Sequence, residues 1–382
     1  MTSIPILLSA GEASGDMYAA RLATALHQRG DFALFGMGGP KMREAGVEII
    51  ADYSEVSVVG ITEVLKRLPS LRRAMRQLVT EAERRRPPLA VLTDFPGFHL
   101  RLARKLRPFA VRNVYYICPQ FWAWRPWRVN LVRRRFARAL CIFPFEEKFY
   151  ADAGVPVTFI GHPLVGEVRA ARGREEFCRA LGFDTGKPII ALLPGSRPAE
   201  LAQHLPVLQE ACALIQTECP AQFVLAASQD ARAESLRRGW PTGMQPQVVE
   251  GQTYDALAAA DSAIISSGTA TVEAALLDTP MVVIYRVTPL TAALAKPLVR
   301  TEFFGMVNLI AGRRVVPELI QKKFTAKRVA QEVLHQLRDA QARCDLRKGL
   351  AVVRERLGPP GAVQRAADAI AHLLPRTAGN AS

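Results

Sequence analysis

The sequence has no long hydrophobic run and no paired cysteines. Its apolar stretches all fall short of the roughly 18 residues that a membrane-spanning helix needs, so no such helix is expected. The N-terminus has no basic segment before an apolar one, and residues 3–9 predict a first β-strand instead of a signal peptide. The six cysteines form no CxxC pair and no zinc-like spacing, which favours free thiols in a reducing compartment.

Internal repeats and low-complexity segments are also missing, whereas apolar residues make up 49% of the 382 residues, enough for sizeable cores. Apolar strands alternate with helical segments in two blocks, a pattern typical of parallel sheets covered by helices on both faces. The expected strands are residues 4–8, 32–36, 89–93, 114–117, 140–143, 157–160, 189–193, 222–226, 262–265 and 281–285. The pattern therefore predicts an α/β protein with two doubly wound, Rossmann-like domains.

We place the first domain at 1–165 and the second at 166–346. Two terminal helices are expected, at 326–346 and 361–374. The segment 347–382 is predicted to be a helical tail that packs back on the first domain or on a partner subunit.

Acidic residues are scarce in the first half of the chain. The net charge is +15, and residues 1–138 carry an excess of 12 positive charges, whereas residues 139–382 carry an excess of only 3. The densest basic stretches are 66–86, 101–112 and 125–138. Such a basic half suits an anionic lipid surface or a nucleic acid, or is simply a solvated arginine-rich face.

Two glycine-containing loops in the second half have the character of phosphate-binding loops. LPGSR (193–197) and SSGTATVE (266–273) each follow an apolar strand and open a helix. A glycine lets the backbone approach a ligand closely, and a helix start offers unpaired N–H groups to phosphate. Arg197 adds a guanidinium fork for phosphate, and Glu273 adds a carboxylate that could bind ribose. The pattern predicts a nucleoside diphosphate site formed by Gly195, Ser196, Arg197, Ser267, Gly268, Thr269 and Glu273.

Two further loops follow apolar strands in the first half. SAGEASGD (9–16) has GxxxG rather than GxGxxG spacing, and Glu12 and Asp16 would repel a pyrophosphate, so no NAD site is expected. TDFPGFH (93–99) places Asp94 at the carboxyl end of a strand, where a carboxylate can deprotonate an acceptor hydroxyl; a helix cap is the structural alternative. His99 is a weaker candidate base, since a satisfied surface histidine explains it better.

Aromatic residues are only 7% of the chain, yet three tryptophans fall within residues 122–127, beside Arg125. Such a loop suits acyl chains, sugar faces, a membrane interface or stacked nucleic-acid bases. An earlier basic segment interleaves apolar and arginine side chains at helical spacing, which suits either a helix lying on an anionic membrane or an ordinary core-facing helix. Its candidate membrane contacts are Leu68, Leu71, Arg72, Arg73, Met75 and Arg76.

Together these motifs resemble the lipid-A-disaccharide synthases, bacterial glycosyltransferases of family 19 with the two-domain GT-B fold. The ordered set covers nearly the whole chain and is specific, although each string alone is weak. The matching strings are SAGEASGD (9–16), DFPGF (94–98), YYICPQFWAW (115–124), PFE (144–146), GHPL (161–164), LLPGSR (192–197), SSGTATVEAAL (266–276), MVVIYRV (281–287) and VNLIAGR (307–313).

The resemblance implies an inverting glycosyltransferase. It would condense UDP-2,3-diacylglucosamine with 2,3-diacylglucosamine 1-phosphate (lipid X) to give UDP and a tetraacyl disaccharide 1-phosphate, in the lipid A biosynthesis of a Gram-negative bacterium. The resemblance also implies two Rossmann-like domains with a cleft between them, no cofactor, no metal, and peripheral attachment to the cytoplasmic face of the inner membrane. It permits a homodimer. No nucleic-acid partner is expected, because one would leave the phosphate loops unused.

The resemblance also suggests roles for single residues. Asp94 would deprotonate the acceptor hydroxyl, while Arg197 and the N–H groups near Gly195 and Gly268 would stabilise the leaving UDP. Glu273 and Asn308 match family positions near the nucleotide. The acceptor side would be lined by Gly11, Glu12, Ser14 and Gly15.

Two departures from the family pattern affect the choice of base. Family members commonly have a second aspartate where this chain has Gly97, and asparagine where it has His99. The general base therefore stays open among Asp94, His99, Glu12 and Asp16. Within the GT-B class, the alternative function is another UDP-GlcNAc-using enzyme, either a 2-epimerase or the peptidoglycan GlcNAc-transferase.

Overall fold

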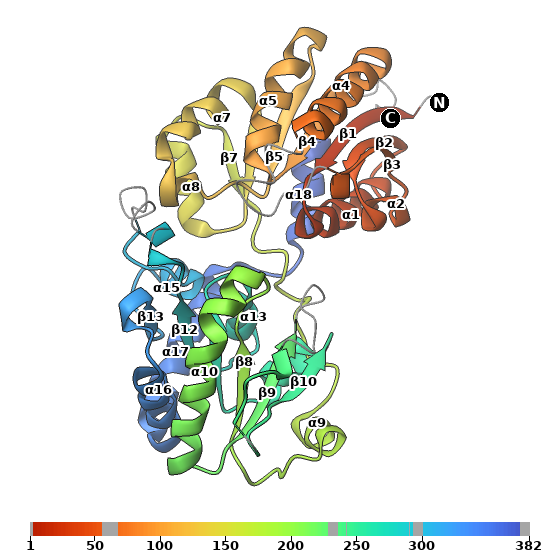
Figure 1. The fold of residues 1–382 in the computed structure, drawn as a ribbon. Helices are drawn as coiled ribbons and strands as arrows, with labels where there is room; N and C mark the ends of the chain where they lie inside the picture. The colour runs from red at the N-terminus through yellow and green to blue at the C-terminus, as the bar shows by residue number, and fades with distance from the viewer. Residues whose placement is uncertain are drawn as a thin grey trace. The chain divides into compact units, whose positions relative to one another are not determined.

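The computed structural model describes residues 3–55, 68–227, 236–241, 243–289, 291–292 and 301–374. The chain divides into two units, each with its own parallel sheet (Figure 1). The first unit contains the residues up to Pro163 and those from Pro359 onward, and the second contains Leu164–Gly358.

In the described ranges, the sheet of the first unit has the strand order β3-β2-β1-β4-β5-β6-β7. Its strands are β1 (Ile4–Ala10), β2 (Phe32–Gly38), β3 (Glu48–Asp52), β4 (Leu89–Thr93), β5 (Arg112–Tyr116), β6 (Arg138–Cys141) and β7 (Val157–Phe159). Its helices are α1 (Ala13–His27), α2 (Pro40–Glu44), α4 (Leu68–Arg85), α5 (Pro96–Leu106), α6 (Phe121–Trp124), α7 (Val129–Arg135), α8 (Pro144–Asp152) and α18 (Ala362–Ala371).

The first sheet is buried on both faces. Leu7 of β1 packs with Leu78 of α4 and Leu102 of α5 in one core. Its strand neighbours Ile6 and Leu8 point to the opposite face and are fully buried as well. Continuous apolar strands of this kind require helices on both faces, which is why the strand pattern is readable in the sequence.

The described part of the second unit has a sheet with the order β10-β9-β8-β11-β12-β13. Its strands are β8 (Ile189–Leu193), β9 (Gln222–Ala227), β10 (Gln247–Glu250), β11 (Ser262–Ser266), β12 (Met281–Tyr285) and β13 (Glu318–Ile320). Its helices are α9 (Arg174–Leu181), α10 (Pro198–Glu218), α12 (Thr253–Ala259), α13 (Thr269–Leu276), α15 (Met306–Ala311), α16 (Ala326–Arg338) and α17 (Ala340–Arg356).

Each sheet reverses its strand order beside its first strand, between β1 and β4 in one unit and between β8 and β11 in the other. In open α/β sheets, ligands bind at the carboxyl ends of strands at such a switch point. The four loops singled out in the sequence follow these four strands. The topology therefore pairs the loop at 11–16 with that at 94–98, and the loop at 194–197 with that at 267–269.

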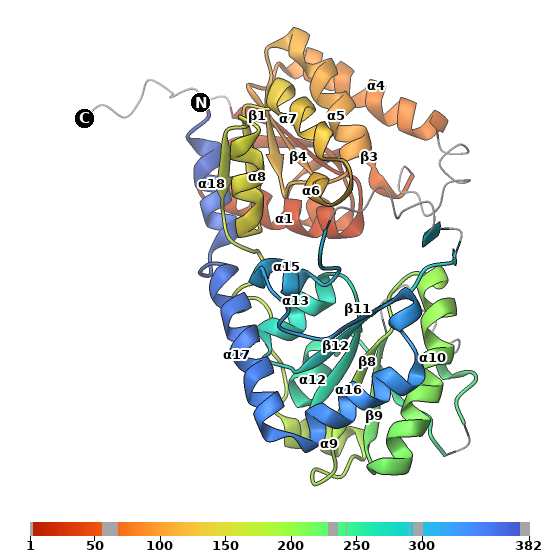
Figure 2. The ribbon, with the colours of Figure 1, turned by 90° about the vertical axis from the view of Figure 1, so that its left-hand side faces the viewer.

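The last two helices belong to different units. Helix α17 packs against α13 and α15 in the second unit, whereas α18 packs against α1 in the first (Figures 1 and 2). Arg29 of α1 donates to the Asp368 carboxylate at 2.6 Å, and Arg365 donates to the Ile160 carbonyl at 2.8 Å. The boundary that the sequence placed at 346/347 lies inside α17, whereas the contacts place it after Gly358.

The prediction of a single helix at 326–346 is wrong, because the structure has two helices over this range. The Asp339 carboxylate accepts hydrogen bonds from the N–H groups of Gln341 and Ala342, at 2.8 and 3.0 Å. This cap satisfies donors at the start of a new helix, so α16 ends at Arg338 and α17 begins at Ala340.

Candidate functional site

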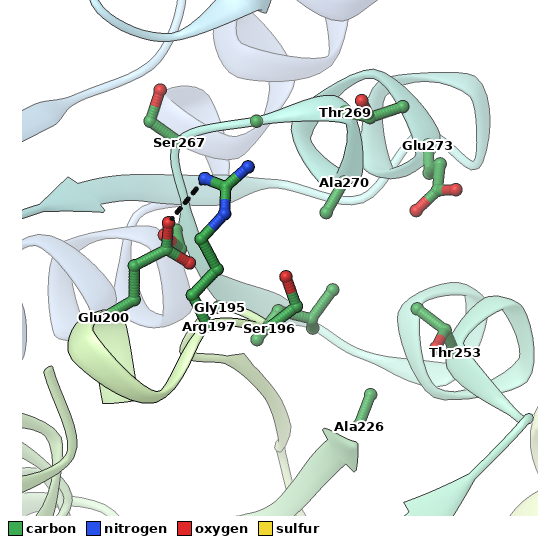
Figure 3. Close-up of a pocket in the computed structure, with 13 residues that line it drawn as sticks. Gly195, Ser196, Arg197, Glu200, Ala226, Thr253, Ser267, Thr269, Ala270 and Glu273 are labelled. Atoms are coloured by element: carbon green, nitrogen blue, oxygen red, sulfur yellow. Dashed lines mark hydrogen bonds and ion pairs between the residues drawn. The ribbon is translucent and has the colours of Figure 1, made fainter. Parts of the chain in front are cut away.

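A hollow of about 380 Å³ lies at the carboxyl edge of the second sheet, where β8 and β11 end and α10 and α13 begin (Figure 3). We call it the second-unit pocket. It contains every residue of the predicted nucleotide site except Asn308. Its lining residues are Leu193, Gly195, Ser196, Arg197, Glu200, Ala226, Thr253, Ser266, Ser267, Gly268, Thr269, Ala270 and Glu273.

The first wall of the pocket requires glycine at position 195. Gly195 has a φ of +113°, and a Cβ added there would lie 2.5 Å from Oε2 of Glu200. Arg197 donates to Oε1 of the same carboxylate at 3.1 Å, and its side chain is 68% exposed. Because this ion pair uses one of five N–H donors, the guanidinium keeps donors for a phosphate. Glu200 escaped the sequence analysis, although it lies three residues after Arg197.

A buried histidine fixes this wall to the neighbouring strand. The N–H at Nδ1 of His204 donates to the Pro194 carbonyl at 2.7 Å, and Nε2 accepts from the Arg286 backbone N–H at 2.9 Å. Because each nitrogen has one role, the ring is held as a neutral tautomer, and burial lowers its pKa. His204 thus joins the loop after β8 to the end of β12. No sequence pattern pointed to it, since both partners are backbone groups.

The second wall begins with two serines in different states. Ser267 donates its hydroxyl to the Phe304 carbonyl at 2.6 Å, so this side chain supports the loop. The hydroxyl of Ser266 is buried and has no hydrogen-bond partner within the described residues. Ser266 is the last residue of β11, whereas the sequence analysis counted it as the first residue of the loop and did not list it among the nucleotide-site residues. A buried unpaired hydroxyl lining a pocket is a candidate ligand contact.

Helix α13 supplies the far end of the pocket. Gly268 and Thr269 bring its first turn, with N–H groups that lack intrahelical partners, to the wall. Glu273 lies one turn further on, and Figure 3 places it across the pocket from Arg197. Burial raises the pKa of Glu273, and the hydroxyl of Tyr254 donates to its carboxylate at 3.3 Å. One end of the pocket thus offers phosphate donors and the other a carboxylate acceptor.

Asn308 lies outside the pocket lining. Its amide is fully buried and makes four hydrogen bonds, accepting from the N–H groups of Val315 and Val316 and donating to the Val316 carbonyl and the Glu318 carboxylate. Glu318 in turn accepts from the N–H groups of Phe304 and Gly305. The structure therefore gives Asn308 a supporting position behind the loop that holds Ser267, and no free group for the nucleotide.

The carboxyl edge of the first sheet joins the other two predicted loops. Glu12 and Ser14 are exposed, whereas Gly11 and Gly15 are buried. A Cβ added to Gly11 would lie 2.2 Å from the Phe95 ring, so the two loops are in contact. The predicted acceptor-side residues and Asp94 are therefore neighbours. We call this group the first-unit edge.

The backbone of Asp94 is held in an unusual conformation. Asp94 and Phe95 have φ values of +49° and +45°, which lie in the left-handed region that residues other than glycine rarely adopt. The Asp94 carbonyl accepts from Nδ1 of His99 at 2.8 Å and from the Tyr115 hydroxyl at 3.0 Å. Such strain persists where surrounding contacts over-determine it, and it is concentrated at functional sites.

The Asp94 carboxyl is chemically distinct from an ordinary surface aspartate. Burial, with a smaller effect of the Glu12 charge, raises its pKa to about 6. A backbone hydrogen bond from Phe95 opposes this shift. At neutral pH the group is mostly ionised, and its pKa lies closer to the working pH than that of a free aspartate, which favours a general base.

Two other candidate bases have structural partners. His99 is fully buried, so its interpretation as a surface histidine is wrong; its Nε2 lies 2.8 Å from the Ser9 hydroxyl, and burial lowers its pKa to about 4. The buried Asp16 carboxylate accepts three backbone N–H groups at the start of α2, the nearest from Gly39 at 2.6 Å. Asp94 is less committed, because its carboxyl accepts a single backbone hydrogen bond, from Phe95, and Glu12 is exposed.

The aromatic loop is anchored on one side. Trp122 donates its indole N–H to Oε1 of Glu146 at 3.1 Å, and the Phe143 N–H donates to Oε2 at 3.3 Å. Glu146 is fully buried, and burial raises its pKa to about 8. It was missed as a single residue because its only signal was the short string PFE.

The other side of the aromatic loop faces solvent. Trp124 is 43% exposed and Trp127 is 62% exposed. The guanidinium of Arg125 lies 4.7 Å from the Trp124 ring centre, and that of Arg128 lies 5.4 Å from the Trp127 ring centre. These paired aromatic and cationic groups form a surface suited to a lipid interface.

Helix α4 is only partly available as a membrane contact. Leu71 and Met75 are partly buried and pack against the first-unit core, which favours the core-facing interpretation for these two side chains. Leu68 is also partly buried, whereas the α4 arginines (Arg72, Arg73 and Arg76) are exposed. The helix therefore presents charge rather than apolar side chains to a surface.

Within the ranges given above, no cluster of three or more His, Cys, Asp or Glu side chains is arranged to hold a metal ion. None of the described helices combines the length and the apolar character that crossing a bilayer requires.

Comparison with known proteins identifies close relatives. Residues 6–359 match the family described as lipid-A-disaccharide synthetase. The chain is 46% identical over 372 residues to a lipid-A-disaccharide synthase of Solibacter usitatus, which covers 97% of both chains. It is 43% identical over 380 residues to one of Myxococcus xanthus, which covers 98% of this chain and 99% of the relative.

Solved structures support the fold. The chain is similar to the calicheamicin glycosyltransferase CalG4, with a TM-score of 0.61 and 18% identity over 99% of this chain and 100% of that one. It is also similar to a UDP-GlcNAc 2-epimerase from Neisseria meningitidis bound to UDP-GlcNAc, with a TM-score of 0.61 and 10% identity over 97% and 99%. These similarities and the two parallel sheets confirm the predicted GT-B fold.

Proposed function

Since the chain belongs to the lipid-A-disaccharide synthetase family, we propose that it transfers the sugar of UDP-2,3-diacylglucosamine to the 6-hydroxyl of 2,3-diacylglucosamine 1-phosphate. The products are UDP and a tetraacyl disaccharide 1-phosphate, with inversion at the anomeric carbon. The observation that carries the proposal is the second-unit pocket, where an exposed arginine, a glycine with positive φ and a helix start face a buried carboxylate.

The second-unit pocket would bind the UDP part of the donor. The diphosphate lies against Arg197 and the N–H groups near Gly195 and Gly268, while Glu273 accepts hydrogen bonds from the ribose hydroxyls. These donors are aimed at oxygens that gain charge as UDP leaves, so they stabilise the transition state more than the ground state. Ser266 adds a hydroxyl with no other partner in the described chain.

The first-unit edge would activate the acceptor. The oxygen of the 6-hydroxyl attacks the anomeric carbon, the bond from that carbon to the UDP oxygen breaks, and the electron pair leaves with UDP. Asp94 takes the hydroxyl proton. Its raised pKa suits this transfer, and the bonds from His99 and Tyr115 to its carbonyl hold its backbone in place. Gly11, Glu12, Ser14 and Gly15 line the acceptor side.

The acylated substrates require a lipid surface. We propose peripheral attachment to the cytoplasmic face of the inner membrane through two features of the first unit. The exposed tryptophans Trp124 and Trp127 insert at the lipid interface, and the α4 arginines attract anionic headgroups.

The alternative function, a UDP-GlcNAc 2-epimerase or the peptidoglycan GlcNAc-transferase, is not favoured. The relatives that cover 97% or more of the chain at 43–46% identity are lipid-A-disaccharide synthases. The solved epimerase shares 10% identity and therefore only the fold. Turnover of non-acylated UDP-GlcNAc in place of the acylated donor would favour the alternative.

The direct test is incubation of the purified protein with both acylated sugars, with UDP release and the disaccharide product followed by coupled assay and mass spectrometry. Asp94→Asn should lower kcat by about 10²–10⁴-fold, the usual contribution of a general base. Arg197→Ala should weaken UDP binding and lower turnover. The exposed Asp31→Asn is the matched control and should leave kcat unchanged.

Absence of disaccharide with verified substrates would end the proposed function. Normal kcat in folded Asp94→Asn would leave the function standing but remove Asp94 as the base.

A further inference from the structure

A second hollow lies at the amino edge of the first sheet, away from the residues proposed above. It has a volume of about 310 Å³, near the lower end of the ~300–1,000 Å³ range of small-molecule sites. It lies where α5 and α7 end and where β5 begins. Four arginines line it, at positions 107, 112, 134 and 135. We call it the arginine hollow.

Two of the lining side chains are bonded to backbone carbonyls. Asn113 is buried and donates to the carbonyls of Ala103 and Arg135, at 3.2 and 3.0 Å. Arg135 donates to the Leu100 carbonyl at 2.8 Å. These bonds join the ends of α5 and α7 to β5, so the backbone that carries the arginines is held by the core.

The charges in the arginine hollow are uncompensated. In the described part of the chain, no carboxylate forms an ion pair with Arg107, Arg112, Arg134 or Arg135. Residues 95–145 contain eleven lysines and arginines and no acidic residue. Burial, together with the positive charges of Arg104, Arg107 and Arg134, lowers the pKa of Arg135.

A role in capping helix ends explains only part of this cluster. Cations near the last turn of a helix are stabilising, by about 0.3–1 kcal/mol each, and Arg104 and Arg134 lie in such turns. Arg107 is the C-cap residue of α5 and Arg135 lies in the last turn of α7, so helix ends account for these two as well, whereas Arg112 begins β5 and lies at no helix end. The charge of Arg112 therefore adds repulsion to the hollow without stabilising a helix end, and an anion bound there would relieve the repulsion among the four arginines.

We propose that the arginine hollow binds phosphate oxyanions, supplied either by a free pyrophosphate-like anion or by the headgroup phosphate of an anionic lipid. Guanidinium groups bind such oxygens through paired N–H donors, and four of them around one hollow can engage both phosphates of a pyrophosphate. The site is separate from the first-unit edge. Leu89 pairs with Arg112, and Asp94 follows five residues later, which places Asp94 roughly 16 Å further along the strand direction.

The test measures pyrophosphate binding to the full chain by isothermal titration calorimetry, with UDP present to occupy the second-unit pocket. The double variant Arg112→Gln with Arg134→Gln should weaken this binding at least tenfold. Arg112→Lys with Arg134→Lys keeps the charges but loses the paired N–H donors, so its affinity should lie between those of the wild type and the Gln double variant. Arg43→Gln with Arg84→Gln is the matched control, since both side chains are more than 60% exposed in the same unit, and it should change binding less than twofold.

A second arm identifies the source of the phosphate. Vesicles of phosphatidylcholine, with or without phosphatidylglycerol, are added to the same proteins. If phosphatidylglycerol vesicles compete with pyrophosphate, and this competition is lost in the Gln double variant, the natural ligand of the arginine hollow is a lipid headgroup. If pyrophosphate binds without such competition, the natural ligand is a free anion.

The inference is overturned if neither probe binds, or if the control variant loses as much affinity as the hollow variant, because diffuse charge would then explain the binding. Thermal unfolding provides a second readout of binding and shows whether each variant is folded. Pyrophosphate should raise the Tm of the wild type and of the control variant but not that of the Gln double variant. The inference does not rest on the proposed function. Binding that survives Arg197→Ala but not the hollow variant separates the two sites even if UDP fails to bind.

Discussion

The substitution Gly195→Ala tests whether the glycine in the second-unit pocket is required for nucleotide binding. It adds a single methyl group where φ is +113° and where the new Cβ would lie 2.5 Å from Oε2 of Glu200. The end of the Glu200 side chain can move, but the same carboxylate holds Arg197 at 3.1 Å. The variant must therefore either keep the loop strained or change its shape and release Arg197.

The size of the effect follows from the backbone. A non-glycine residue in such a region costs about 1–3 kcal/mol. In the free variant the loop relaxes and avoids this cost, whereas UDP binding requires the original shape and restores it. The affinity for UDP should therefore fall by about 1–3 kcal/mol, or roughly five- to 150-fold.

Calorimetric titration with UDP measures this change. Gly173→Ala is the matched control in the same unit, because its φ is −71° and an added Cβ meets nothing within 4 Å. It should bind UDP like the wild type. Wild-type affinity in folded Gly195→Ala would refute the claim that close backbone approach at this loop forms the phosphate site.

Three further predictions follow from the same contacts. Because the Asp94 base must be ionised and its pKa is about 6, kcat/KM should fall about tenfold per pH unit below pH 6 and level off above it. Glu12→Gln removes a neighbouring negative charge and should move this fall in kcat/KM to lower pH; an unchanged pH profile would contradict Asp94 as the base. His204→Leu leaves the Pro194 carbonyl and the Arg286 N–H without partners, so it should lower the free energy of unfolding by about 2 kcal/mol or more, lower Tm and weaken UDP binding. His204→Asn can keep the bond to Pro194 and should therefore lower stability and UDP affinity less; equal effects of the two variants would argue that His204 does not position the loop. Replacing the α4 arginines by glutamate should reduce pelleting with phosphatidylglycerol vesicles, and unchanged pelleting would assign the lipid contact to other residues.

The strands at the centre of each sheet were predictable from local sequence. All ten expected strands are present. Nine of them are central strands, which are buried on both faces and read as continuous apolar runs, whereas the tenth, β7, lies at an edge of the first sheet. Three strands were missed, at Glu48–Asp52, Gln247–Glu250 and Glu318–Ile320, and all three lie at sheet edges. An edge strand has one exposed side and mixed polarity, so its pairing depends on the neighbouring strand rather than on its own pattern.

The four candidate loops were also readable from the sequence, because glycines and polar residues directly after apolar strands mark the carboxyl edge of a parallel sheet. The resemblance to the family added the chemical role that is proposed for each loop. What the strings do not contain is the state of each side chain. Ser266 and Ser267 are adjacent and chemically identical, yet one hydroxyl is bonded to the Phe304 carbonyl and the other has no partner in the described structure.

These differences arise from contacts between segments far apart in the chain. Asn308 serves the backbone at 315–316, His204 bonds to the backbone of Arg286, 82 residues away, and His99 of α5 is buried against Ser9 of β1. Hydrogen bonds of this kind mostly use backbone groups, which every residue carries, so no residue pattern announces them. Local sequence thus places the candidate loops at the ends of buried strands, whereas long-range packing decides which of their polar side chains are bonded within the protein and which are left without a partner.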